Sequence, residues 1–314
     1  MRALLSSRWT TLGLLCLVIA ALPLVFPSGY YYRVAALVWI SAIAAVGLNI
    51  FMGYAGQVSL GHAGFFGIGA YAVAIGPARF GLNSWLCIFL GVFLSAALAW
   101  LVGRPILRLR GHYLAIATLG LGFLIALVLA NEARWTGGPD GTAVPRLTIA
   151  GARLMEPVTW YWISGGLLTL GTALALNLEN SAVGRALRAL HDSEIAAALA
   201  GIDVARHKLR AFVIAAVYAS LAGSALALFD GFITPDAAGF LRSIELVAMV
   251  VVGGIGSTAG SIVGAGLLVT LPQILAVFVE YEQIALGLII MVVMIFLRRG
   301  IVPSARRLIV RRAP

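Results

Sequence analysis

Residues 34–78 read VAALVWISAIAAVGLNIFMGYAGQVSLGHAGFFGIGAYAVAIGPA, and none of these side chains carries a charge. At about 1.5 Å per residue, a single helix of this length would be more than twice as long as the roughly 30 Å hydrocarbon layer of a bilayer. The stretch therefore predicts two membrane crossings in succession.

The rest of the chain is equally apolar. Of the 314 residues, 61% are hydrophobic and 11% are charged, with a mean hydropathy of +1.02, whereas a soluble domain has roughly 25% charged residues. Apolar runs predict about ten crossings, near residues 10–27, 34–53, 61–78, 84–103, 112–130, 159–177, 211–229, 244–256, 260–279 and 283–297. The third and eighth border glycine-rich turns and could be re-entrant. We expect an all-α, polytopic helical bundle with glycine-rich broken helices, forming one transmembrane domain over residues 1–314. We interpret the first run as an uncleaved helix, with a secretory signal peptide as the alternative.

The basic residues predict an orientation. Twenty-one of the 22 are arginine, and the formal net charge is +10. If the N-terminus is cytoplasmic, 16 basic residues lie on the cytoplasmic side of the membrane, including a basic tail at 298–314. This distribution predicts that both termini are cytoplasmic. Six fall outside, namely Arg33, Arg79, Arg134, Arg146, Arg153 and Arg242. Glu245 is then expected at the outer interface. Because the basic residues flank apolar spans and form no groove with interleaved aromatics, nucleic acid is not an expected partner.

The longest cytoplasmic connection, at about 178–210, contains GRALRALHDSEIAAALAGID at residues 184–203. We expect one helix over 185–191 and a second from Ser193, its N-cap, through Ala200, with Gly201 as a left-handed C-cap. Asp203 is expected to cap the next membrane helix. Arg188 can reach Asp192 at i+4. An apolar stripe recurs at i, i+3, i+4 and i+7, made by Ile195, Ala198, Leu199 and Ile202. The segment either lies against its own membrane domain or docks a soluble partner.

Two glycine-rich runs permit alternative interpretations. In GYAGQVSLGHAG (53–64), the polar side chains Gln57, Ser59 and His62 line a transport pathway or form a satisfied tight turn. In the run 253–264, helix packing through glycines spaced four apart and a turn at 253–260 are favoured over a ligand cradle. No histidine pair has metal-ligand spacing, and no serine has a nearby base, so we expect no catalytic or metal site. The sole lysine, Lys208, does not lie in a phosphate-binding loop, which excludes that mode of ATP binding.

The segment NSAVGRALRALHDSEIAAALAGIDVARHKLRAFVIAA (180–216) resembles the cytoplasmic coupling segment of LivM-type permease subunits of ATP-binding-cassette importers for branched-chain amino acids. Four further stretches are similar to blocks of the same family in the same order, at residues 49–71, 109–123, 136–147 and 243–268. His112 departs from the pattern, because an acid is more usual there.

The resemblance implies a transport subunit in a bacterial-type inner membrane, without a cofactor and without enzymatic activity of its own. It implies cytoplasmic ATPase subunits, a second related permease and an extracytoplasmic binding protein as partners. It also implies that six residues contact the ATPase: Gly184, Arg185, Arg188, Asp192, Glu194 and Gly201. Related permeases carry urea or short amides, which leaves the substrate open. The rival hypothesis is a self-sufficient secondary transporter or channel, which would need ionisable residues inside its spans.

Overall fold

The computed structural model describes residues 8–149, 152–153, 156–275, 287, 291 and 300–304. The long helices are α1 (Arg8–Ala21), α2 (Gly29–Asn49), α3 (His62–Phe80), α4 (Ser84–Ile106), α5 (His112–Asn131), α7 (Pro157–Asn180), α10 (Val204–Asp230), α11 (Phe240–Gly253) and α12 (Thr258–Leu275). The short helices are η1 (Leu22–Leu24), η2 (Ile50–Tyr54), α6 (Ala133–Thr136), η3 (Gly138–Asp140), α8 (Ala182–Asp192), α9 (Glu194–Leu199) and η4 (Pro235–Ala238). Two-residue strands form two antiparallel pairs, β1 (Thr142–Ala143) with β4 (Phe232–Ile233) and β2 (Thr148–Ile149) with β3 (Ala152–Arg153).

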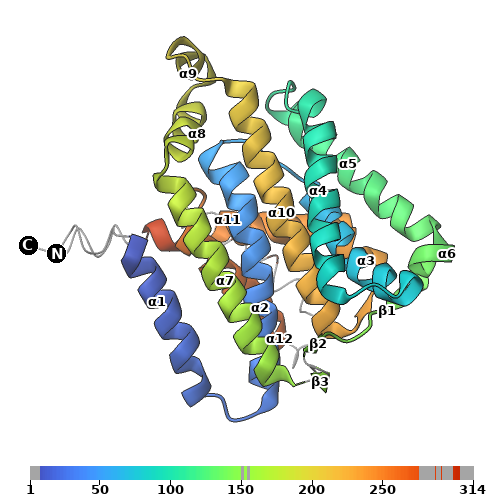
Figure 1. The fold of residues 1–314 in the computed structure, drawn as a ribbon. Helices are drawn as coiled ribbons and strands as arrows, with labels where there is room; N and C mark the ends of the chain where they lie inside the picture. The colour runs from blue at the N-terminus through green and yellow to red at the C-terminus, as the bar shows by residue number, and fades with distance from the viewer. Residues whose placement is uncertain are drawn as a thin grey trace, which may run out of the picture.

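The predicted all-α bundle is confirmed (Figure 1). In the described part of the chain, six helices are long and apolar enough to cross a membrane, namely α2 with η2, α3, α4, α5, α7 and α10. The apolar runs of α1 and α12 are shorter. The tenth predicted crossing, 283–297, lies outside the described residues apart from Gly287 and Met291, so the count of ten is not confirmed.

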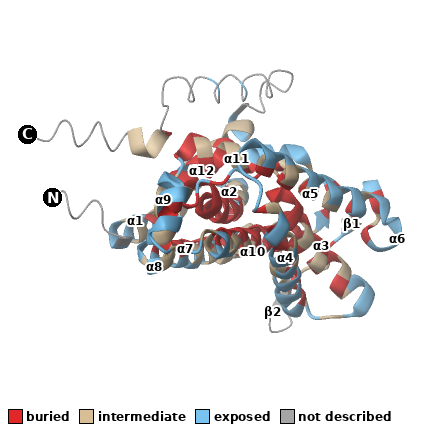
Figure 2. Ribbon diagram, turned by 90° about the horizontal axis from the view of Figure 1, so that it is seen from above, coloured by how far each residue is buried: buried red, intermediate tan, exposed pale blue. Residues whose placement is uncertain are grey.

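Helix α2 forms the centre of the bundle, surrounded by α7, α10, α11 and α12 (Figure 2). Every residue from 38 to 55 is buried. A helix that is apolar all round lies either in a protein core or in a membrane, and here its neighbours are protein on every side. Small residues let its neighbours approach closely, and Gly47 packs directly against the Tyr218 side chain of α10.

Both glycine-rich runs are breaks between helices, as the sequence predicts. Helix α2 continues into the π-helical turn η2, and residues 55–61 then lead into α3. Helices α11 and α12 are separated by residues 254–257, and the Asn49 side chain of α2 accepts a hydrogen bond from Gly256 N at 2.9 Å. Gly260 and Gly264 of α12 lie against backbone atoms of α11, which confirms the expected packing role.

Charged residues that the orientation prediction assigns to the two sides of the membrane lie at opposite ends of the bundle. Arg110 and Glu194 meet at one end, where α8 and α9 lie (Figure 1). At the other end Arg79 donates to the Arg134 carbonyl, and Arg33 pairs with Asp230 at 3.2 Å. We call these the α8–α9 end and the opposite end.

Arg242 and Glu245 differ from expectation. The Arg242 guanidinium donates to Ser41 Oγ at 3.3 Å, and Ser41 lies about halfway along the continuous helix Gly29–Tyr54. Helix α11 has 14 residues, about 21 Å, too short to cross the hydrocarbon layer. It starts inside the bundle, because β4 and η4 fold back from the end of α10 and bring Ala238 against Gly67 of α3. The prediction that Arg242 and Glu245 lie at the outer interface is therefore wrong.

Candidate functional site

The connection between α7 and α10 consists of two short capped helices, and residues 182–201 are called the α8–α9 segment below. Ser193 Oγ accepts from Ala196 N at 3.2 Å, and Asp203 Oδ1 accepts from Arg206 N at 3.0 Å. Gly201 has a positive φ of 81°, the left-handed conformation that glycine adopts without strain. The predicted Ser193 and Asp203 caps and the left-handed Gly201 are confirmed, although α9 ends at Leu199 and α8 begins earlier than expected, at Ala182.

The start of α8 depends on a serine cap and a glycine. Ser181 Oγ accepts a hydrogen bond from Gly184 N at 3.3 Å. A Cβ atom at Gly184 would collide with the carbonyl oxygens of Leu178 and Glu179. Only glycine therefore allows α8 to turn back over the end of α7 at this angle.

The two helices of the segment differ in what their apolar residues contact. Helix α8 buries Leu187 and Leu190 against the membrane domain. Helix α9 exposes Ile195 and Leu199, which are 68% and 85% accessible. The membrane domain does not cover these two side chains. The structure thus places α8 against its own domain and leaves the apolar side of α9 uncovered.

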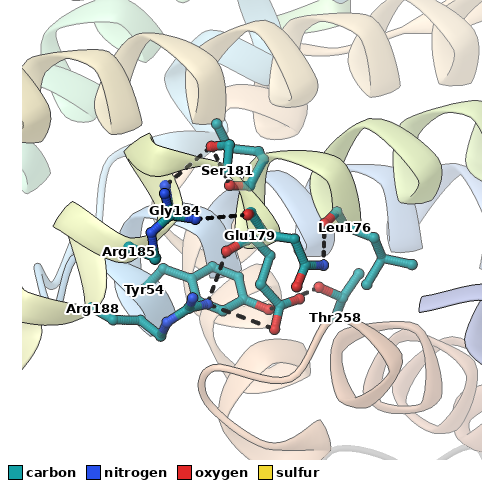
Figure 3. Close-up of polar contacts among 10 residues, drawn as sticks. Tyr54, Leu176, Glu179, Ser181, Gly184, Arg185, Arg188 and Thr258 are labelled. Atoms are coloured by element: carbon teal, nitrogen blue, oxygen red, sulfur yellow. Dashed lines mark hydrogen bonds and ion pairs between the residues drawn. The ribbon is translucent and has the colours of Figure 1, made fainter. Parts of the chain in front are cut away.

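A polar network joins α8 to the breaks in the bundle core (Figure 3). Arg188 Nη1 donates to the Glu179 carbonyl at 2.9 Å and lies 4.0 Å from Glu179 Oε1. The Tyr54 hydroxyl, at the end of η2, donates to Glu179 Oε2 at 3.0 Å. The same hydroxyl lies 3.0 Å from Thr258 Oγ1, the first residue of α12. The network therefore links α8 to both broken helices.

Arg185 and Arg188 both contact the end of α7. Arg185 Nη1 donates to the Asn180 carbonyl at 3.2 Å. Among the contacts of the described residues, Arg188 pairs with Glu179 and not with Asp192, so the expected i+4 pair is replaced by a bond to another helix. Asp192 ends α8 and is exposed.

Glu194 connects α9 to three other segments. Its carboxylate forms an ion pair with Lys208 of α10, and it accepts from Gln57 Nε2 at 3.2 Å. Arg110 Nε lies 3.5 Å away. Burial alone would raise the pKa of the Glu194 carboxyl, but the hydrogen bond and charge of Lys208 outweigh it and hold the pKa below its usual value. Glu194 therefore anchors the first turn of α9 as a carboxylate.

The three candidate pathway residues are all buried, at the α2–α3 break. Gln57 donates to Glu194 and to the Ala55 carbonyl. Ser59 Oγ lies 2.7 Å from His62 Nδ1. The His62 ring packs among those of Phe51, Phe65 and Phe212. His62 Nε2 is buried and has no hydrogen-bond partner among the described residues. The contacts therefore match neither a fully satisfied turn nor an open path, and a pathway role stays a prediction.

Sequence reasoning did not assign Tyr54, Glu179 or Lys208 to this site. Their contacts join residues far apart in the chain, which no local pattern reports. Lys208 carried one available signal, because it is the only lysine of the chain and begins a membrane helix. Its side chain is 3% exposed, and a buried lysine requires a carboxylate partner.

The chain matches known permeases along most of its length. The family model described as the permease component of branched-chain amino acid transport systems matches residues 30–297. The chain is 35% identical over 297 residues to "High-affinity branched-chain amino acid transport system permease protein LivM" of Escherichia coli, covering 87% of this chain and 70% of that protein. It is 26% identical over 287 residues to the corresponding LivH protein of Salmonella typhimurium, covering 83% and 90% of the two chains.

No solved structure gives a significant match. The family match covers the broken helices, the α8–α9 segment and the polar network described above. The chain belongs to the family of permease components of branched-chain amino acid transport systems.

Proposed function

We propose that this chain is one membrane-spanning half of an ATP-driven importer for branched-chain amino acids, and that its α8–α9 segment docks on a cytoplasmic ATPase chain. The observation that carries the proposal is the exposed pair Ile195 and Leu199 on a helix whose base is anchored by Glu194. A docking helix needs an apolar surface for its partner and a rigid attachment to its own domain, and α9 has both.

The coupling residues divide into two roles. Gly184, Gly201 and Glu194 hold the helices in place, whereas Arg185 and Arg188 join α8 to the end of α7. Asp192 is exposed at the junction of the two helices and is available to contact the ATPase. A movement of the ATPase would pass through Arg188, Glu179 and Tyr54 to α2 and α12.

The other partners follow from the family. Relatives of two kinds, named LivM and LivH, match this chain, which supports a second, different permease completing the pathway. ATP hydrolysis then takes place on the ATPase chains, and an extracytoplasmic binding protein delivers the amino acid. In this arrangement the α8–α9 end faces the cytoplasm of a bacterial-type inner membrane.

The test is co-purification of the chain with its ATPase partner, followed by uptake measurements in proteoliposomes. A double Ile195→Asp/Leu199→Asp variant should no longer associate with the ATPase, because two charges replace the apolar contact. Its ATP-driven leucine uptake should fall at least tenfold. A Gly184→Val/Arg188→Ala variant should assemble poorly or hydrolyse ATP without transport. Arg79→Gln, at the opposite end, is the matched control and should behave as wild type.

Two results would refute the proposal. Normal association and uptake in both double variants would show that the segment docks nothing. Leucine uptake by this chain alone, without ATP or a partner, would identify a self-sufficient transporter.

A further inference from the structure

Arg242 and Glu245 form an ion pair inside the membrane domain. Arg242 Nη1 donates to Glu245 Oε2 at 2.9 Å, and Nη2 donates to Ser41 Oγ at 3.3 Å. The guanidinium also lies over the Phe66 ring, 5.0 Å from its centroid. Since Ser41 is halfway along the candidate membrane helix Gly29–Tyr54, the pair lies at about mid-height of that helix, the depth expected for the middle of a bilayer.

Glu245 does not face the protein core. Its side chain is 56% exposed, while that of Arg242 is 19% exposed. A carboxylate at this depth cannot face hydrocarbon without a large free-energy cost. This face of α11 must therefore meet water in a pathway or a protein partner, and the broken helix beside it is typical of transporter substrate sites.

A pocket of about 250 Å³ opens at the pair. Arg242 and Glu245 line one part of it, and apolar side chains line much of the rest, among them Ile244, Met249, Leu268 and Val269. Gln273, which accepts a hydrogen bond from Tyr30 in the first turn of α2, also lines it. The pocket thus extends from mid-membrane towards the opposite end, from which substrate would enter.

The polar groups of the pocket suit a zwitterion. Arg242 Nε is buried and has no hydrogen-bond partner among the described residues. Helix α11 starts at Phe240, two residues before Arg242, and its N-cap Gly239 provides no side-chain cap, so the positive end of the helix dipole adds to the field of the guanidinium. A carboxylate can therefore bind Arg242, and an ammonium group can bind Glu245 beside it.

We infer that the pocket at Arg242 and Glu245 is a binding site for the transported α-amino acid within the permease, with Arg242 holding its carboxylate, Glu245 its ammonium group and the apolar wall its side chain. The inference rests on the proposed function, because it assigns the substrate of the same pathway. It places the site on α11, away from the candidate residues Gln57, Ser59 and His62.

The experiment uses the complete importer in nanodiscs and proteoliposomes, with tritiated leucine as the probe. Arg242→Gln and Glu245→Gln should each reduce leucine binding by the importer without its binding protein, and leucine uptake, at least tenfold. ATP hydrolysis stimulated by the binding protein should stay within twofold of wild type. Arg79→Gln is the matched control, because it also removes one cation, whose hydrogen bond to the Arg134 carbonyl lies away from the pocket, and it should leave binding and uptake unchanged.

Substrate analogues distinguish carboxylate binding by Arg242 from ammonium binding by Glu245. In the wild type, 4-methylpentanoate, which lacks the amino group, and isoamylamine, which lacks the carboxylate, should each compete with leucine at least tenfold more weakly than unlabelled leucine. In Glu245→Gln the discrimination against 4-methylpentanoate should disappear, while that against isoamylamine should remain.

Several outcomes would overturn the assignment. Wild-type leucine binding in both charge-neutral variants would do so, and so would unchanged analogue discrimination in Glu245→Gln. If the neutral variants fail to assemble, Arg242→Lys keeps the positive charge without the guanidinium fork, and full leucine binding by that variant would reject the site. A wild-type importer that takes up no leucine would instead refute the proposed function.

Discussion

At the scale of single residues, Glu194 shows how one side chain fixes a surface helix. Lys208 is almost fully buried, and Glu194 is its ion-pair partner. Removing one member of such a pair leaves the other charge buried without compensation, which costs roughly 3–5 kcal/mol for a fully buried pair. Because Glu194 is 21% exposed, we expect a smaller loss, about 2 kcal/mol.

The first prediction concerns Glu194→Gln. This variant should loosen α9, and hydrogen exchange should speed up in residues 194–202 by one order of magnitude or more. A Glu194→Gln/Lys208→Met double variant should recover most of the protection, because it removes both charges together. Unchanged exchange in the single variant would show that the ion pair does not hold the helix.

The same residue predicts a pH dependence. Burial raises the pKa of the Glu194 carboxyl, but the hydrogen bond and charge of Lys208 outweigh it, so the folded-state pKa lies below the unperturbed value of 4.5. Its contribution to stability is therefore present above about pH 4.5 and is lost as the pH falls through the folded pKa. A fluorophore on a Leu199→Cys variant, with Cys16 and Cys87 replaced, should lose anisotropy below about pH 4.5. This loss of anisotropy should be absent when the labelled protein also carries Glu194→Gln. Equal losses with and without Glu194→Gln would show that the pH dependence does not come from Glu194.

At the scale of elements, the Tyr54 hydroxyl links α2, α7 and α12 through Glu179 and Thr258. A hydrogen bond to a charged group contributes about 1.5–3 kcal/mol. We predict that Tyr54→Phe leaves the fold and the ATPase association intact but uncouples ATP hydrolysis from transport. ATP hydrolysis should continue while leucine uptake falls severalfold. The ratio of leucine transported to ATP hydrolysed in proteoliposomes measures this.

Tyr218→Phe is the matched control for that measurement. The Tyr218 hydroxyl also donates a hydrogen bond between helices, to the Gly171 carbonyl at 2.7 Å, but it does not touch the network around Glu179. Its loss should lower stability without changing the ratio of transport to hydrolysis. Equal ratios in Tyr54→Phe and the wild type would show that coupling does not pass through Tyr54.

Helix ends and breaks were predictable from the sequence because their causes are local. Ser193, Gly201 and Asp203 act within a few residues of themselves, and the breaks near Gly53 and Gly254 follow from glycine and from the length of the apolar runs. The depth of Arg242 was not predictable in this way. It depends on how residues 231–239 pack against α3, and counting apolar residues along the sequence does not reveal such packing.

At the scale of the whole molecule, the sequence does not show which helix is central. Helices α4 and α5 are as apolar as α2, yet α2 is almost wholly buried and the other two are largely exposed. Lipid and protein interior are similarly apolar, so hydropathy does not separate them. The alanines of α2 are a better signal, since small residues permit close packing on every side.

The orientation of the bundle is the last prediction. The charge distribution places the α8–α9 end in the cytoplasm, and the proposed ATPase contact requires the same. In a background without Cys16 and Cys87, a membrane-impermeant maleimide should label Phe80→Cys in right-side-out membranes, because exposed Phe80 ends α3 at the opposite end. It should label Leu199→Cys only in inside-out vesicles. The reverse pattern would put α9 outside the cell, beyond the reach of any cytoplasmic ATPase, and would exclude the coupling mechanism together with the orientation.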